Sequence, residues 1–139
     1  MKNKKQIIEE MNNQRPEFIR LLGGTMIDFS DEMPMCTFEF DIGKEYCHSI
    51  DIVQGGFITA MLDVVMSHSI FVQGPELMGL SSLEIKTSYL EPTRAGKLRV
   101  EGYILKQSYK MAFLEGRMYN AENTLTATAS TVAKLIRPK

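Results

Sequence analysis

Residues 53–71 read VQGGFITAMLDVVMSHSIF, and the architecture of the protein follows from this segment. Its length and its content of Ala, Met and Leu favour a helix, although Val64 and Val65 have the opposite preference. A helix that is apolar nearly all the way round must be buried nearly all the way round. One antiparallel sheet of about six strands could bury it by curling around it, and dimerisation could cover the remainder.

The segments on either side of this helix alternate as strands do. TFEFDI, residues 37–42, places apolar and polar side chains in turn, which is typical of a half-buried strand. Residues 82–90 alternate in the same way, with one set on each face: Leu83, Ile85 and Tyr89 against Ser82, Glu84 and Lys86. Four further segments predict strands: 25–29, 98–105, 111–119 and 125–136. Short polar turns between the last three favour antiparallel neighbours.

The first part of the chain predicts a helix over residues 4–22, with a break near Pro16 and an end at Gly23-Gly24. The order of elements is therefore helix, two strands, helix, four strands, which defines an α+β fold. A chain of 139 residues has the size of one domain. We expect residues 1–24 to form an N-terminal helical segment and residues 25–136 to form the core.

Composition excludes several classes of function. The net charge of −1 gives no reason to expect nucleic acid or an acidic membrane as a partner. The N-terminus has no apolar run behind its lysines, so we expect no secretory signal and a cytoplasmic protein. Cys36 and Cys47 are typical of free cytosolic thiols. We expect no metal site, because His48 and His68 are the only histidines.

Asp63 is the single acid in the central helix. An ionised carboxylate in an apolar surround costs several kcal/mol unless it is paired or hydrogen-bonded. Burial would raise its pKa and suit it to general-base catalysis. Ser67 lies one turn later on the same face and could hydrogen-bond it. A structural acid that ties the helix to the sheet explains the residue equally well.

Gly55 and Gly56 stand where this helix begins, and the first turn of a helix offers unpaired N–H groups. Such a turn could hold a carbonyl oxygen that becomes an oxyanion, although a plain strand-to-helix turn also suits two glycines. Gly55 and Asp63 are about 12 Å apart along a helix that rises 1.5 Å per residue. Both can act on one substrate only if two antiparallel helices meet across a two-fold dimer.

The stretch VQGGFITAMLD, residues 53–63, resembles the central-helix signature of the hotdog-fold acyl-CoA thioesterases of the PaaI type. The family pattern is Asn, five residues, His or Gln, Gly-Gly, and an Asp eight residues after the first Gly. GLSSLEIKTSYLEPTRAG, residues 79–96, resembles the family strand that follows, including its closing Pro-x-x-x-Gly. The resemblance covers most of residues 25–136 and implies a hotdog fold, an antiparallel sheet wrapped around a long central helix.

The resemblance also implies roles for individual residues. Asp63 matches the catalytic acid, which activates water or attacks the thioester. Ser82 matches the hydroxyl that positions water beside that acid, and Gly55 of the other subunit matches the backbone donor to the thioester carbonyl. Gln54 stands at the His/Gln position and, with Gly56 and Ser67, is expected to contact substrate. The implied partners are an acyl-CoA substrate and a second copy of the chain, in a homodimer or a dimer of dimers, with no cofactor beyond the CoA of the substrate.

His48 departs from the family pattern, because the family Asn falls at this position. Histidine can both donate and accept a hydrogen bond only in a suitable tautomer, and it can become charged. Arg94, in the PTRAG turn, is the best-placed candidate to hold the CoA phosphates, ahead of Lys110 and Arg117. Two other functions stay open: a hotdog hydratase or dehydratase that uses His48 and Asp63, and a non-catalytic acyl-CoA-binding protein.

Overall fold

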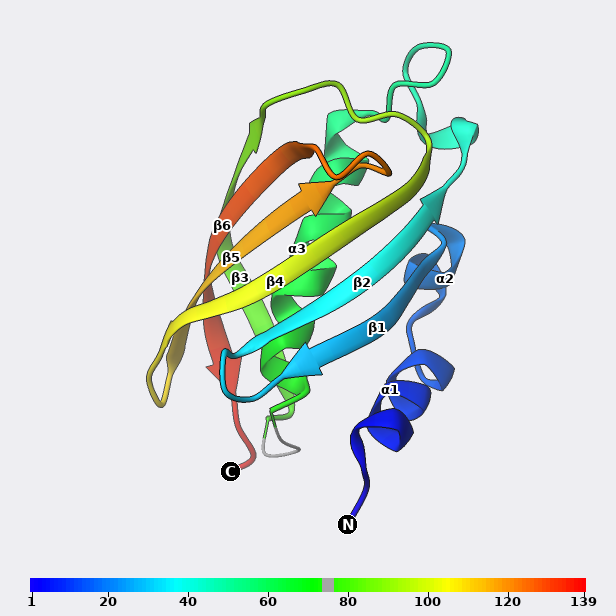
Figure 1. Cartoon of the computed structure of the whole chain (residues 1–139). Coiled ribbons are helices and arrows are strands. Elements are labelled where there is room, and N and C mark those ends of the chain that lie inside the picture. Colours follow the sequence, from blue (N-terminus) through cyan, green and yellow to red (C-terminus); the bar gives the residue numbers. More distant parts are fainter. Residues whose placement is uncertain (74–76) are drawn as a thin grey trace.

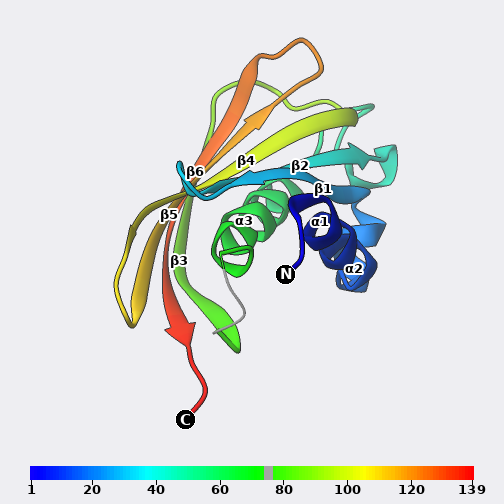
Figure 2. The same cartoon turned by 60° about the horizontal axis from the view of Figure 1, so that its bottom comes forward.

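The computed structural model describes residues 1–73 and 77–139. Six antiparallel strands form one sheet in the order β1-β2-β4-β5-β6-β3. The strands are β1 (Gly24–Ser30), β2 (Met35–Ile42), β3 (Gly79–Tyr89), β4 (Gly96–Gln107), β5 (Met111–Tyr119) and β6 (Leu125–Ile136). The sheet curls around the 17-residue helix α3 (Gly55–Phe71), as Figures 1 and 2 show. The predicted α+β hotdog fold is confirmed.

The N-terminal segment forms two helices, α1 (Lys4–Asn13) and α2 (Glu17–Leu21), and a short 3-10 helix η1 (Lys44–Tyr46) follows β2. Pro16 is the N-cap of α2, so the predicted break near this residue is confirmed. Asn3 caps α1 through a reciprocal pair of hydrogen bonds with Gln6. Both helices lie on the β1 side of α3 (Figure 2), and no helix of residues 1–73 or 77–139 covers its β3 side.

Helix α3 lies directly against β4 and β2. A Cβ atom on Gly102 of β4 would lie 2.4 Å from the Val65 carbonyl oxygen, so only glycine permits this approach of helix backbone to sheet. Cys36 of β2 donates its Sγ–H to the same oxygen over 3.2 Å. These contacts fix the distance between α3 and the sheet. The buried residues of α3 are Ile58, Met61, Leu62, Val64, Val65, Met66, Ser69 and Ile70.

Strand β3 contains an irregularity that changes which side chains face the helix. Ser82 pairs with Ala133 and Glu84 pairs with Val132, so Leu83 is an extra residue in β3. Because of this bulge, Ser82 faces α3 and Leu83 is 58% exposed. The prediction grouped Leu83 on one face with Ile85 and Tyr89, and Ser82 on the other. This grouping is wrong at the start of the strand, because Ser82 and Tyr89 both reach α3 whereas Leu83 does not.

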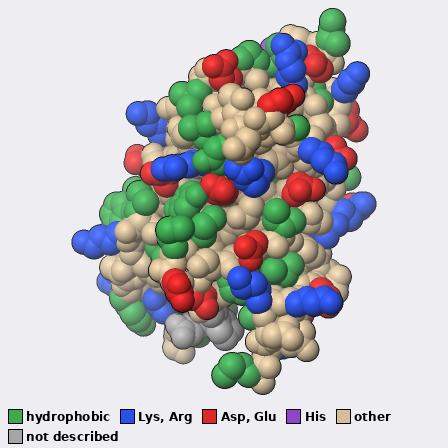
Figure 3. Space-filling model, viewed as in Figure 1, with side chains coloured by type: hydrophobic (Ala, Val, Ile, Leu, Met, Phe, Trp, Pro, Cys, Tyr) green, Lys and Arg blue, Asp and Glu red, His purple; other side chains and the backbone are tan. Residues whose placement is uncertain are grey.

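Some features of the surface are relevant to partners. Within residues 1–73 and 77–139, no helix has the length and hydropathy needed to cross a membrane. The face of the molecule in Figure 3 intersperses acidic and basic side chains. Two of the ion pairs in the described chain are Arg99–Glu101 and Arg117–Glu115. Cys36 is buried and Cys47 is partly buried, and both are free thiols.

Candidate active site

The start of α3 leaves one backbone donor without a partner. Gln54 is the N-cap, with extended backbone angles, and its side-chain oxygen accepts a hydrogen bond from the Gly56 N–H over 2.7 Å. The next two N–H groups, those of Phe57 and Ile58, both donate to the Gln54 carbonyl. In the described part of the chain the Gly55 N–H makes no hydrogen bond, so it is available at the positive end of the helix dipole.

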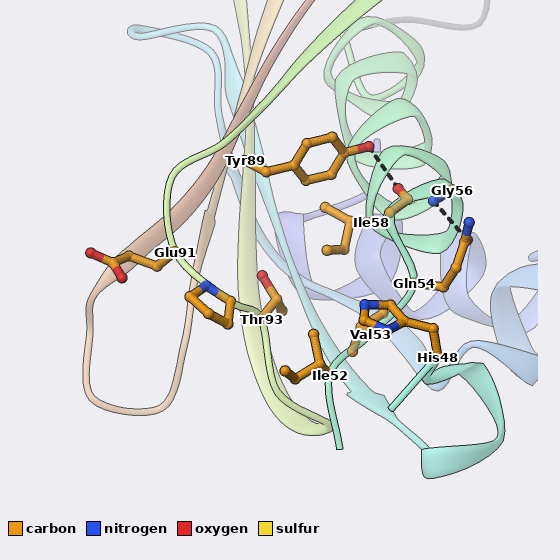
Figure 4. Close-up of a pocket in the computed structure, with 11 residues that line it drawn as sticks. His48, Ile52, Val53, Gln54, Gly56, Ile58, Tyr89, Glu91 and Thr93 are labelled. Atoms are coloured by element: carbon orange, nitrogen blue, oxygen red, sulfur yellow. Dashed lines mark hydrogen bonds between the residues drawn. The ribbon is translucent and has the colours of Figure 1, made fainter. Parts of the chain in front are cut away.

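Gly55 lines a cleft of about 470 Å³ that forms between the loop before α3, the start of α3 and the segment after β3 (Figure 4). Polar groups come from the predicted site residues His48, Gln54 and Gly56. Apolar walls come from Ile52, Val53, Ile58 and Pro92. A cleft with apolar walls and a few converging polar groups is the usual form of a small-molecule site.

His48 is exposed at the edge of this cleft. The ring Nδ1 of His48 lies 2.8 Å from the Ser49 hydroxyl. The backbone N–H of His48 donates to the Ile52 carbonyl. An isolated antiparallel β-bridge between Cys47 and Val53 closes the loop that contains His48. His48 and the Gly55 donor therefore belong to the same cleft of one chain.

Asp63 lies two turns further along α3 and is half-buried. The Ser82 hydroxyl donates to Asp63 Oδ1 over 3.0 Å, which leaves the other carboxylate oxygen for a further partner. Ser67 is half-buried one turn later, but the described structure shows no hydrogen bond between it and Asp63. The acid and the hydroxyl are thus together in one chain, and the β3 bulge is what aims Ser82 at α3.

The single chain does not unite its two polar centres. Asp63 does not line the cleft that contains Gly55, and the eight-residue spacing corresponds to about 12 Å of helix. Arg94 also lies outside that cleft, where it pairs with Asp51 over 2.7 Å and lines a neighbouring hollow with Lys97. The two hollows share Pro92.

Tyr89 and Thr59 are site residues that sequence reasoning missed. Tyr89 lines the cleft and donates its hydroxyl to the Gly55 carbonyl over 2.9 Å. Thr59 lies 3.0 Å from that hydroxyl. The alternation of residues 82–90 could have placed Tyr89 on the face toward the helix, but it could not show which turn of α3 the side chain meets.

The fold defines a hotdog-fold protein, and a family model identifies the family. The model of the thioesterase superfamily matches residues 51–127, so the chain belongs to that superfamily. The prediction of a PaaI-type hotdog thioesterase is confirmed at the level of family. Membership supports a thioesterase-type function.

Solved structures agree with this assignment of the fold. A phenylacetic acid degradation-related protein from Ralstonia eutropha is 22% identical over 92% of this chain and 98% of its own, with a TM-score of 0.83. A thioesterase from Haemophilus influenzae is 14% identical over 99% and 92%, with a TM-score of 0.82. The PaaI protein of the E. coli phenylacetic acid degradation operon is 13% identical over 93% and 91%, with a TM-score of 0.81. No curated protein matches the chain.

Proposed function

We propose that this protein hydrolyses an acyl-CoA thioester to a free acid and CoA in a site that two chains share. The observation that carries the proposal is the division of polar groups along α3. A free N–H stands at its first residue, and a carboxylate with a hydroxyl partner stands eight residues later. Neither centre is a complete hydrolytic site, but an antiparallel pair of α3 helices would bring one of each together twice.

The groups suit attack by water on a thioester. Asp63 accepts a proton from water as the oxygen of that water attacks the carbonyl carbon, and Ser82 holds the carboxylate in place. The Gly55 N–H of the partner subunit donates to the carbonyl oxygen as negative charge develops there. Collapse of the intermediate breaks the C–S bond, and the proton held by Asp63 passes to the sulfur of the departing CoA. Direct attack by Asp63, with an anhydride intermediate, uses the same groups.

The cleft around Gly55 is suited to the pantetheine arm, because it combines apolar walls with polar groups at its rim. Arg94 and Lys97 line the adjoining hollow, where two cations could hold CoA phosphates. To bind a phosphate, Arg94 would either leave Asp51 or contact Asp51 and the phosphate together. The proposed assembly is a homodimer or a pair of such dimers, and it needs no cofactor other than the CoA of the substrate.

A panel of acyl-CoAs, assayed for thiol release, tests the proposal. Asp63→Asn should lower kcat roughly 10²- to 10⁴-fold, which is the range for loss of a general base. Asp41→Asn, which removes an exposed carboxylate of β2, should leave hydrolysis unchanged. Full activity of Asp63→Asn would show that another group activates water, and a wild-type protein that releases no thiol from any acyl-CoA would refute the activity itself.

A further inference from the structure

We propose that Tyr89 is a positioning residue that fixes the backbone donor at the start of α3, a role that rests on the hydrolytic function proposed above. Tyr89 comes from the end of β3 and reaches across the cleft to the first turn of the helix (Figure 4). Its hydroxyl donates to the Gly55 carbonyl over 2.9 Å. No residue role implied by the family resemblance includes this side chain.

Both peptide groups that meet at Gly55 are held by hydrogen bonds. In the peptide between Gly55 and Gly56, Tyr89 binds the carbonyl and the Gln54 side chain binds the N–H. In the preceding peptide, the Gln54 carbonyl accepts from Phe57 and Ile58. Among the residues that the structure describes, the Gly55 N–H is the only group of these two peptides without a hydrogen bond, so its direction is fixed before a substrate arrives. Such preorganisation is what an oxyanion donor needs.

A chain of hydroxyls stands behind Tyr89. The Thr59 hydroxyl lies 3.0 Å from that of Tyr89 and 2.8 Å from that of Thr87. The Gly55 carbonyl can only accept, and each hydroxyl has one proton to donate. Tyr89 therefore donates to Gly55, Thr59 donates to Tyr89, and Thr87 donates to Thr59. Each bond polarises the next, and the chain couples β3 to the first turns of α3.

The Tyr89 ring also covers Gly55. A Cβ atom at residue 55 would lie 3.0 Å from the Tyr89 hydroxyl oxygen and 3.1 Å from Cζ. The phenol is 53% exposed and forms part of the cleft wall. Tyr89 thus holds the donor from one side while the cleft stays open on the other.

The test compares Tyr89→Phe with Tyr119→Phe in thiol release from the best acyl-CoA substrate. Tyr89→Phe keeps the ring and removes the hydroxyl, whereas Tyr119 stacks on Arg99 away from the cleft. We expect Tyr89→Phe to lower kcat roughly tenfold with KM within about twofold, because a loosened donor weakens binding of the transition state and not of the substrate. Tyr119→Phe should match the wild type in both constants.

Thr59→Val provides the second arm, since it breaks the chain one step behind Tyr89. It should lower kcat less than Tyr89→Phe does, and the double variant should be no slower than Tyr89→Phe alone, because Thr59 acts through Tyr89. If the two substitutions caused separate packing defects, the factors by which each lowers kcat would instead multiply. This pattern in kcat is a readout that a purely structural role would not produce.

Wild-type kcat in Tyr89→Phe, or a raised KM with unchanged kcat, would overturn the positioning role while wild-type hydrolysis still supports the proposed function. Multiplicative losses in the double variant would overturn it as well. Should Tyr89→Phe fail to fold, Thr59→Val decides the matter, and a wild-type kcat there overturns the role. Absence of hydrolysis by the wild type would remove both the function and the role of Tyr89.

Discussion

Gly55 is a glycine because of its neighbours and not because of its backbone angles. The glycines of the described chain with positive φ are Gly23 and Gly96, so α3 begins without strain. A side chain at residue 55 would press on Tyr89, and one at Gly56 would lie 2.8 Å from the Gln54 side-chain oxygen. The two glycines thus make room for the hydroxyl and the cap that fix the free N–H.

Replacing Gly55 by proline tests the N–H directly. Proline is well tolerated at the first position of a helix, and Gln54 already has the extended angles, φ −66 and ψ 139, that a residue before proline requires. Gly55→Pro should reduce kcat roughly 10²- to 10³-fold below that of Gly55→Ala, which is the cost of losing one oxyanion donor. Gly55→Ala is the matched control, because it adds the same Cβ and keeps the N–H. Equal rates would show that this N–H does not serve the reaction.

His68 is a titratable residue that the proposed mechanism does not use. Its ring packs edge-on against Phe38 and Phe71, with centroids 5.1 and 5.8 Å away. Burial lowers the pKa of His68 from its usual 6.5, and the hydrogen bond to the Val64 carbonyl opposes that shift only in part. Below about pH 6.5 the unfolded chain therefore binds a proton that the folded protein excludes, and stability falls as the pH falls.

Urea unfolding between pH 7.5 and 5.5 measures this effect. The free energy of unfolding of the wild type should decrease toward pH 5.5, and His68→Leu should flatten the decrease because it removes the titrating group. His48→Asn is the control, since His48 is the other histidine and is exposed, and it should follow the wild type. Parallel curves for wild type and His68→Leu would mean that His68 does not govern this pH range.

At the scale of elements, the pattern of apolar positions predicted the six strands and the broken N-terminal helix. The central helix has no such pattern, and its length and its content of Ala, Met and Leu predicted it instead. It was wrong at the start of β3, because the bulge at Leu83 adds a residue that the letters SSLE do not signal. The family resemblance singled out Ser82, and the bulge explains how Ser82 reaches the helix. The helix itself begins two residues later than position 53, since Gln54 serves as its cap.

The site was less predictable than the fold. The distance between Gly55 and Asp63 follows from helix geometry alone, so the proposal of a site shared by two chains could be made from spacing. The contacts of Tyr89 with α3 and of Arg94 with Asp51 join residues 34 and 43 positions apart. Such pairings depend on how the sheet curls, and no local pattern encodes them.

The contact between α3 and β4 depends on Gly102. A Cβ there would lie 2.4 Å from the Val65 oxygen and 2.9 Å from the Met66 Cα, and neither backbone atom can move without the helix. Gly102→Ala should destabilise the fold by about 1–3 kcal/mol, the usual cost of overpacking, as measured by urea unfolding. Gly79→Ala in β3 is the control, because its Cβ would meet nothing closer than 3.7 Å. Equal stability of the two variants would show that α3 shifts freely on the sheet.

At the scale of the whole molecule, α3 has one side that neither the sheet nor the N-terminal helices cover. The sheet covers one side of the helix, and α1 and α2 lie toward β1 (Figure 2). The remaining stripe, with Gly56, Ala60, Asp63 and Ser67, is exposed or half-buried. A second copy laid antiparallel along this stripe would place each Asp63 near the opposite helix start.

Mixing two inactive variants tests whether the site is shared. A dimer of one Gly55→Pro chain and one Asp63→Asn chain has one site with both defects and one with neither, provided that Gly55 and Asp63 act from different chains. Random exchange makes about half of all dimers mixed, each with one intact site of two, so activity should return to about a quarter of the wild-type value, as expected for a two-fold assembly. Denaturing and refolding the variants together, with each variant refolded alone as the control, provides the measurement. If both residues act from the same chain, every site in the mixture has a defect, and no activity returns.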